Sequence, residues 1–280
     1  MSRTHFYRDS YLKTGWLPMN PLARSIAVGD VCHLQQGRFQ PLLNCVDAHL
    51  VERVVVSHPL TLDPVSWHFS RDAQQVLCET HWAESEEGER SAFTKHVLEF
   101  RQAGGYVFSA EAAQARLLTN WHQIRDDVTL KLTQLHYSFR EIYVVTGVVQ
   151  ASEWGLVIAD RSEARLEMST ALASHDQHAL LGHESTCVHQ SRGIVELEQA
   201  QGRSAYFFKA KKLVLSDATH DRYLSQLLDN HARLLPSEMP NWLDTPLINL
   251  VKSNELNLNN SIGFFAWADM NLDDVERLAN

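Results

Sequence analysis

Histidines are the residues most able to do chemistry in this sequence, and there are 15 of them among 280 residues. The densest cluster, His175 to His189, reads HDQHALLGHESTCVH, and within it His183, Cys187 and His189 are residue types that bind zinc. Their spacings match none of the paired patterns of structural zinc sites. The segment also joins two amphipathic stretches, where polar residues are expected. We therefore expect no metal here, with a zinc-dependent hydrolase as the minor alternative.

Motifs of the common enzyme classes are absent from the sequence. There is no GxSxG, GxxxxGK(S/T), GxGxxG or HExxH motif. Cys78 and His81 are close enough in sequence to suggest a nucleophile and its base, but such a pair also needs an orienting third group, and a structural role is favoured. These patterns predict a protein that is not an enzyme and needs no cofactor.

The bulk composition predicts a folded, acidic protein. Hydrophobic residues make up 44% of the chain and charged residues 21%, which suits a substantial core and is too ordinary for disorder. The net charge of -9 argues against nucleic acid as a partner. Cys32, Cys45, Cys78 and Cys187 form no CxxC pair, which favours free thiols. With no apolar run of 18 residues and no apolar N-terminal core, we expect a cytoplasmic protein.

The histidine cluster lies between two stretches with strand-like patterning. From Glu141 to Met168 an apolar run leads into a strict alternation, and a partner follows from Gly193 to Leu215. The alternating apolar residues are Ala164, Leu166 and Met168 in the first stretch and Val195 and Leu197 in the second. Side chains that alternate in this way have one face covered and one face wet. The two stretches therefore predict a long antiparallel hairpin.

A second hairpin is predicted upstream. Residues 66–82 and 93–109 favour strands, with Leu98 and Phe100 on one face, and the acidic sequence ESEEGERS between them is typical of a solvated turn. Two shorter strands are expected around a turn at Gln36 and Gly37.

Helices are expected at two places. Apolar residues at steps of three and four predict a helix from Glu111 to Leu135 and another from Asp221 to Leu235. Together these elements predict an α+β fold, with a twisted, mainly antiparallel central sheet, two long hairpins and peripheral helices.

The C-terminal part of the chain differs from the rest in charge. The residues from Leu234 to Asn280 include seven acids and two bases, a net charge of -5. Apolar anchors are spaced along this tail: Trp242, Leu247, Leu250, Phe264, Phe265 and Trp267. We expect a domain spanning residues 1–233 and a docking tail spanning residues 234–280.

Two motifs resemble the pore-forming part of the gasdermins. The sequence IYVVTGVVQ, Ile142 to Gln150, follows an expected helix and is similar to the family's helix-to-strand passage. GRSAYFFKAKKLVLSD, Gly202 to Asp217, resembles the closing strand of the family's second hairpin. Upstream, VGDVCHLQQGRFQPLLNC is loosely similar to an early segment of the family. The resemblance covers residues 10–217, in order.

The resemblance implies a latent pore-forming protein in bacterial cell-death defence. A protease would cut the C-terminal tail, and the freed protein would assemble with copies of itself at membrane lipids and permeabilise the membrane. The protein would be cytoplasmic when inactive and at the inner membrane when activated. The hairpins would span residues 66–109 and 143–215. Bacterial relatives often carry an acylated cysteine near the N-terminus, whereas the first cysteine here is Cys32, so acylation is not carried over.

The resemblance also implies roles for individual residues. The residues expected to insert into the membrane are Leu98, Phe100, Leu156, Ile158, Leu166, Met168, Val195 and Leu197. Contacts with lipid headgroups are expected from the basic cluster Lys209, Lys211 and Lys212, which would also pair with the acidic tail. An autoinhibitory role falls to the six apolar anchors of the tail. The rival interpretation is a soluble binding or scaffold protein of the same architecture, which the overall acidity favours.

Overall fold

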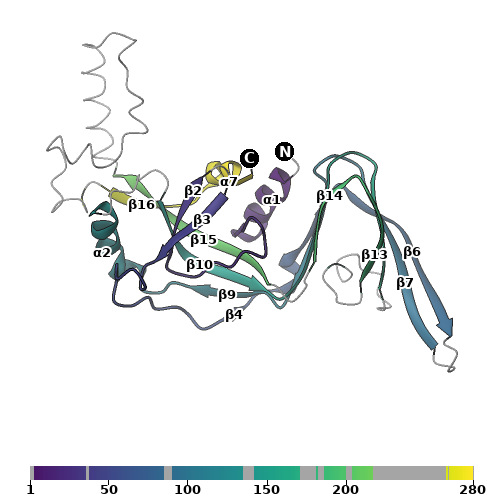
Figure 1. Cartoon of the computed structure of the whole chain (residues 1–280), viewed down its shortest axis with the longest axis horizontal. Helices are drawn as coiled ribbons and strands as arrows, with labels where there is room; N and C mark the ends of the chain where they lie inside the picture. The colour runs from purple at the N-terminus through teal and green to yellow at the C-terminus, as the bar shows by residue number, and fades with distance from the viewer. Residues whose placement is uncertain are drawn as a thin grey trace, which may run out of the picture.

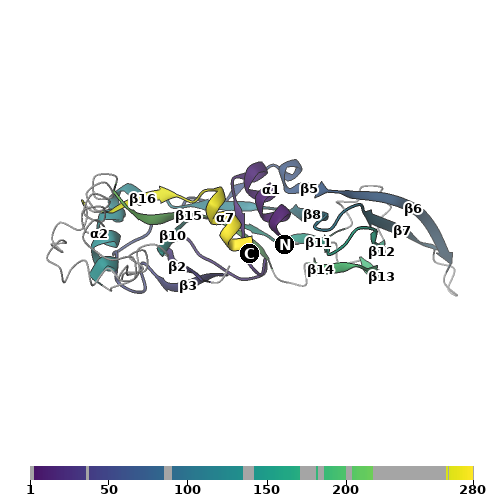
Figure 2. The same ribbon diagram turned by 90° about the horizontal axis from the view of Figure 1, so that it is seen from above.

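The computed structural model describes residues 3–35, 38–84, 90–134, 142–170, 181, 186–199, 204–216, 263 and 265–279. Within these residues the protein is an elongated α+β molecule built from antiparallel sheets (Figures 1 and 2). An eight-stranded sheet forms the body at one end, and two four-stranded sheets follow one another toward the other end. The predicted fold class is therefore confirmed.

The sheet of the body is organised around two long strands, β10 (Ile142–Ala151) and β15 (Ala205–Leu215), which pair along their length. The other side of β10 is shared by β2 (Asp30–Gln35) and β9 (Gln114–Leu117). The other side of β15 is shared by β1 (Leu17–Pro18) and β16 (Phe265–Asp269). On the β10 side of the sheet the edge strands are β3 (Arg38–Asn44), which pairs with β2, and β4 (Leu60–Thr61), which pairs with β9.

Both faces of β10 are buried, which explains its continuous apolar run. On one face Tyr143, Val145 and Val148 join the main core with α1 (Thr4–Thr14) and α7 (Leu272–Ala279). On the other face Ile142 and Val144 meet α2 (Trp121–Gln134) in a second core. Gly147 of β10 has no room for a side chain, since a Cβ atom there would lie 2.9 Å from Leu117.

The two predicted hairpins are present and lie side by side. The first comprises a short helix, η1 (Pro64–Trp67), and then β5 (His68–Arg71), β6 (Ala73–Glu84), β7 (Arg90–Phe100) and β8 (Tyr106–Glu111). The second continues from β10 through β11 (Glu153–Ala159) and β12 (Ala164–Thr170), and returns through β13 (Cys187–Arg192) and β14 (Ile194–Gln199) into β15. The turn sequence ESEEGERS lies mostly outside the described residues.

The helix predicted from Glu111 to Leu135 is wrong in its first half. Gln114–Leu117 form strand β9, and the helix begins only at Trp121. The alanines of this segment favour a helix, but pairing with β10 and β4 satisfies the backbone and overrides that preference. The strands predicted on both sides of Gln36 and Gly37 are confirmed as β2 and β3. The helix expected at 221–235 lies outside the described residues.

None of the helices within the described ranges has both the length and the hydropathy that a membrane-spanning helix needs.

Candidate functional site: a folded four-stranded ribbon

The two hairpins form one four-stranded ribbon that bends back on itself (Figure 1). The sheet next to the body has the order β14-β11-β8-β5 and is called the proximal sheet below. The sheet farther out has the order β13-β12-β7-β6 and is called the distal sheet. Each strand of one sheet continues along the chain into a strand of the other. The ribbon is therefore a single pair of adjacent hairpins with a bend across all four strands.

The bend has a left-handed backbone residue on each of its four strand paths. These residues are Asp72 (φ 52°), Gly104 (φ 77°), Glu163 (φ 59°) and Gly193 (φ 69°). Backbone hydrogen bonds then tie neighbouring paths together across the bend, for example from Glu163 N to Phe100 O at 2.8 Å and from Gly104 N to Ala159 O at 2.8 Å. A left-handed conformation costs a residue other than glycine about 1 kcal/mol or more, so the bend at Asp72 and Glu163 is held by its surroundings.

Near the bend the concave face of the ribbon is apolar and closes on itself, whereas farther along the distal sheet the same face also carries the uncharged polar side chains of Thr80, Thr94, His96 and Thr170. Val107, Val157 and Ala159 from the proximal sheet form one buried cluster with residues of the distal sheet. The distal members of this cluster are Leu98, Phe100, Ala164, Leu166 and Met168, all fully buried. The predicted alternation along 164–168 is therefore confirmed.

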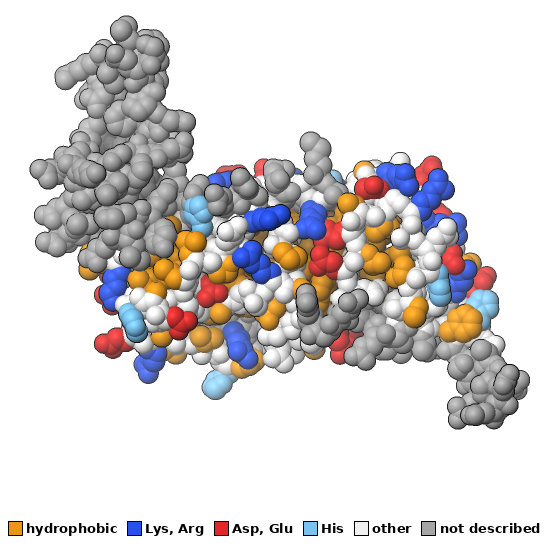
Figure 3. Space-filling model, in the orientation of Figure 1, with side chains coloured by type: hydrophobic (Ala, Val, Ile, Leu, Met, Phe, Trp, Pro, Cys, Tyr) orange, Lys and Arg blue, Asp and Glu red, His pale blue; other side chains and the backbone are white. Residues whose placement is uncertain are grey.

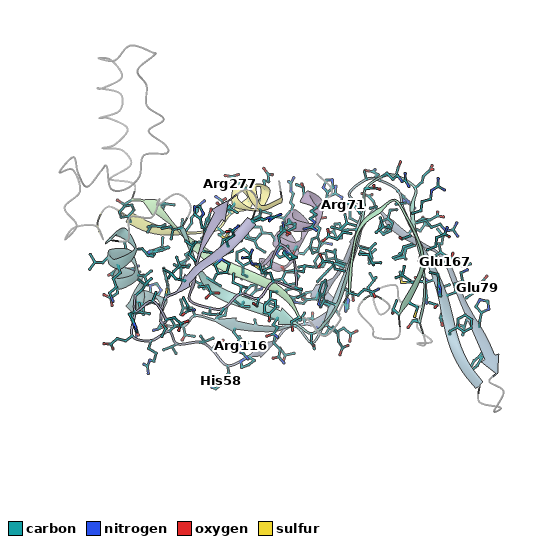
Figure 4. All side chains as sticks on the ribbon, in the orientation of Figure 1. His58, Arg71, Glu79, Arg116, Glu167 and Arg277 are labelled. Atoms are coloured by element: carbon teal, nitrogen blue, oxygen red, sulfur yellow. The ribbon has the colours of Figure 1, made fainter. Side chains whose placement is uncertain are left out.

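The convex face of the distal sheet carries the charges. On the described side chains of β6, β7, β12 and β13, Asp, Glu, Lys and Arg occur only on this face, as the strand register shows. They are Glu79, Lys95, Glu99, Arg165, Glu167 and Arg192. Figure 3 shows both signs of charge gathered on the outer surface of this limb, and Figure 4 marks Glu79 and Glu167 on it. Among the described side chains, the distal sheet therefore has one mainly apolar face and one charged face.

The remaining residues expected to insert into a membrane are divided between two faces. Leu156 and Ile158 lie on the opposite face from Val157 and pack into the main core of the body. Val195 and Leu197 are 54% and 36% exposed, whereas Glu196 between them is buried. The alternation along β14 is thus real, but its acidic residue faces inward.

A buried ion pair explains that inversion. Glu196 lies 2.6 Å from Arg3, which precedes helix α1. Burial, and to a smaller extent the nearby Glu198, raise the pKa of Glu196 to about 7 against the opposing effect of Arg3. The pair ties α1 to the second hairpin.

Helix α1 also holds the first hairpin. The Tyr106 hydroxyl donates a hydrogen bond of 2.8 Å to Asp9, and Arg71 lies 3.5 Å from the same carboxylate. Burial, followed by the bond to Asp9, raises the pKa of Tyr106 far above its ordinary value. Phe6 stacks on Phe69 with ring centroids 6.0 Å apart. Sequence reasoning missed Arg3 and Asp9, because no local pattern links them to strands tens of residues away.

The described end of the C-terminal tail docks on the body. Strand β16 adds to the edge of β15, and Phe265 is buried in the second core. Trp267 meets Trp121 of α2 edge to face at 5.1 Å and donates a 2.8 Å hydrogen bond to Thr129. The other predicted anchors, Trp242, Leu247, Leu250 and Phe264, lie outside the described residues.

Two of the three predicted basic residues pair with acidic residues of this tail. Lys211 lies 2.7 Å from Asp269, and Lys212 lies 2.9 Å from the buried Asp274. Lys209 instead lies over the Trp16 ring, 4.5 Å from its centroid. The expected contact between the basic strand end and the acidic tail is confirmed for Lys211 and Lys212.

The candidate catalytic residues do not come together. Cys78 and His81 lie on opposite faces of β6, because Cys78 pairs in register with His96 and His81 pairs with Phe93. Most of the His175–His189 segment, with His183, lies outside the described residues. Within the described part of the chain no group of three His, Cys, Asp or Glu residues is arranged to hold a metal ion. There His189 lies 2.6 Å from the Ser169 hydroxyl.

Two solved structures are similar to the protein. One is the cryo-EM structure of the gasdermin A3 membrane pore, at 11% identity and a TM-score of 0.36, covering 76% of this chain and 89% of that chain. The other is a bacterial gasdermin from Bradyrhizobium tropiciagri, at 11% identity and a TM-score of 0.32, covering 75% of this chain and 86% of that chain. No protein-family model and no curated protein match the sequence. At this identity and TM-score the likeness assigns no activity to the chain.

Proposed function

We propose that this chain is a latent pore-forming protein of the gasdermin type. The observation that carries the proposal is the separation of side chains on the distal sheet, where the described charged residues lie on the convex face and the concave face is mainly apolar. A sheet that crosses a membrane needs one face for lipid and one for water. A soluble form must hide the lipid face, and the bend does so by folding it against the proximal sheet.

The lengths of β6 and β7, two of the four distal strands, suit this role. Strand β6 has 12 residues and β7 has 11, and a strand needs about 9–11 residues to cross the apolar part of a bilayer. Both outer strands, β6 and β13, have a side that pairs with no other strand among the described residues. Such edges can pair with a second copy of the chain, which supports assembly into a ring.

In this proposal the C-terminal tail keeps the ribbon in its bent form. It adds β16 to the edge of β15, and the Tyr11 hydroxyl of α1 donates a 2.9 Å hydrogen bond to Met270 O. Helix α1 in turn holds both hairpins through Arg3 and Asp9. Removing the tail would weaken the packing of α1 and so favour release of the ribbon, since a segment stabilises only the state that it binds better.

We propose the following sequence of events from proteolysis to permeabilisation of the membrane. A protease cuts within the tail, between the described β15 and β16, and the freed protein moves from the cytoplasm to the inner membrane. There it assembles with copies of itself and permeabilises the membrane, in bacterial cell-death defence. Its partners are lipids, itself and the protease, and it performs no catalysis. Lys209, Lys211 and Lys212 contact lipid headgroups once the tail has left.

Dye leakage from vesicles tests the proposal. Full-length protein is mixed with phosphatidylethanolamine–phosphatidylglycerol vesicles, with and without limited proteolysis, and the cut is mapped by mass spectrometry. We expect leakage only after the tail is cut. A cleanly trimmed protein that leaves the vesicles intact would favour the soluble scaffold instead.

Trp82 provides a sharper version of this test. It is 73% exposed and lies on the same face of the distal sheet as the apolar cluster, since β6 and β7 keep their register there. Trp82→Asp should leave folding unchanged and abolish leakage, because a charge would then face lipid. The matched control is His81→Asp, at the same depth on the charged face, which should still leak. Equal leakage from both variants would overturn the assignment of faces.

Leu166→Asp places a carboxylate within the buried apolar cluster of the concave face. This variant should also block leakage, because the carboxylate would face lipid after insertion.

A further inference from the structure

The convex face of the distal sheet carries a pair of metal-binding side chains on each of its two outer strands. On β6 the pair is Glu79 and His81, and on β13 it is Cys187 and His189. All four residues are exposed. The strand register places Glu79 and Cys187 at the two ends of one row that crosses all four strands on this face. Each outer edge of the sheet therefore presents potential metal ligands.

The two side chains of each pair lie close together. His81 Nε2 lies 3.6 Å from Glu79 Oε2. His189 lies at a bulge of β13, where its Nε2 is 2.6 Å from the Ser169 hydroxyl, and Ser169 is also the register partner of Cys187. The contact with Ser169 engages Nε2 and leaves Nδ1 to bind a metal, as is usual for a histidine ligand that a second group orients.

A single copy of the chain cannot bring the two pairs to one ion. Strands β7 and β12 lie between β6 and β13, so the pairs are three strand spacings apart, about 14 Å. Zinc ligands lie only about 2.0–2.3 Å from the ion. This agrees with the absence of any group of three such ligands within the described part of one chain.

Two neighbouring copies can bring the pairs together. When β6 of one copy pairs with β13 of the next, one strand spacing separates them, and convex-face side chains meet side chains of the same face. This pairing of two copies is called the seam below. A stagger of two residues along the seam places His81 opposite Cys187 and Glu79 opposite His189. An even stagger keeps the faces matched, and closing a sheet of tilted strands into a ring requires a stagger.

We propose that a zinc ion binds at each seam, held by Glu79 and His81 of one copy and by Cys187 and His189 of the next. A thiolate, two imidazoles and a carboxylate are ligand types of four-coordinate zinc sites. Cys187 binds as the thiolate and releases its proton to water. Strand pairing forms the seam, and the ion adds to its stability by linking the two copies. This inference rests on the proposed function and goes beyond it, because it names a ligand of the assembly.

The first experiment measures zinc in rings of the wild-type protein. Full-length protein is cut by limited proteolysis on phosphatidylethanolamine–phosphatidylglycerol vesicles in the presence of zinc, and the rings are extracted in detergent, washed and analysed by atomic emission. We expect about one zinc ion per subunit, because a ring has as many seams as subunits, and a much lower zinc content in the uncut protein. Cobalt in place of zinc should give a thiolate-to-metal charge-transfer band that Cys187→Ser removes.

A mixture of two variants tests whether the site joins neighbouring copies. One variant lacks the β6 pair (Glu79→Gln with His81→Ala), and the other lacks the β13 pair (Cys187→Ser with His189→Ala). Rings of either variant alone should retain little zinc. Rings from an equal mixture should retain about a quarter of the wild-type amount, because about a quarter of the seams then join two intact pairs. His122→Ala removes an exposed histidine of the body and should retain the full amount.

The possible outcomes separate this inference from the proposed function. Wild-type rings that leak yet hold no zinc would overturn the inference alone. It would also be overturned by variants that retain the wild-type amount of zinc, or by a mixture that recovers none. Vesicles that stay intact after the tail is cut would instead contradict the proposed function.

Discussion

Glu196 is buried beside Arg3, where burial raises the pKa of the carboxyl group from 4.5 to about 7. A raised pKa means that the folded state binds the proton more tightly than the unfolded state does. The stability that the folded state gains from the protonated Glu196 is fully present below about pH 4.5, and it is lost as the pH rises through about 7.

The free energy of unfolding should therefore fall between pH 5 and pH 7.5, and Glu196→Gln should flatten this dependence. Urea unfolding at a series of pH values measures it. Glu153→Gln, an exposed change on β11, serves as the control and should keep the wild-type slope. Parallel slopes for wild type and Glu196→Gln would show that this carboxyl is not the source of the dependence.

Asp274 is the most enclosed acid among the described residues of the tail, with 3% of its side chain exposed. It accepts hydrogen bonds from Lys212 at 2.9 Å and from the Tyr143 hydroxyl at 3.2 Å. Asp274→Ala leaves a half-buried ammonium group unpaired, which should cost about 3 kcal/mol. We expect a lower urea midpoint and leakage without protease. Asp273→Ala removes an exposed acid from the same helical turn, and leakage equal to that of Asp274→Ala would refute the specific role of the buried pair.

The burial of single residues was predictable where a local sequence pattern determines which face of a strand they occupy. The burial of Ala164, Leu166 and Met168 follows from alternation alone. The inward position of Glu196 does not, because it depends on Arg3, which lies near the start of the sequence. Alternation shows that two faces differ, and only the neighbouring element decides which face is buried.

The bend is the feature of the elements that most controls the ribbon. Glu163 is exposed and holds a left-handed conformation (φ 59°) that glycine adopts freely and a β-branched residue strongly resists. Glu163→Val should destabilise the bent form by about 1–2 kcal/mol, and Glu163→Gly should preserve or slightly increase its stability.

Urea unfolding and the rate of leakage after proteolysis test this pair of variants. We expect Glu163→Val to leak faster than wild type and Glu163→Gly to leak at the same rate or more slowly. Because both variants remove the same carboxylate, identical behaviour would mean that the backbone conformation at this position does not govern opening.

The bend itself could not be read from the sequence. The run from Glu141 to Met168 contains no Gly-Pro break, and a continuous strand is the natural prediction. Strands β11 and β12 are instead separated by a turn at 160–163, where backbone hydrogen bonds to neighbouring strands hold the chain. In the same way β9 replaces the first part of a predicted helix, since sheet pairing outweighs intrinsic preference.

At the scale of the whole molecule, the class of fold and the two hairpins were predictable from the periodicity of the apolar residues. The contact between the basic end of β15 and the acidic tail was predictable from their opposite charges. What sequence could not supply was the arrangement of α1, which lies between the tail and both hairpins (Figure 2) and whose contacts with these elements are long-range.

The ribbon has four strands, an even number, and its outer strands run in opposite directions: β6 away from the bend and β13 toward it. When β6 of one copy lies beside β13 of the next, the new pair is antiparallel like every pair inside the ribbon. Each addition presents an identical free edge, so the alternation of direction survives any number of additions. The number of strands per subunit therefore does not limit the size of an assembly. The curvature of the ribbon alone determines how many subunits close a ring.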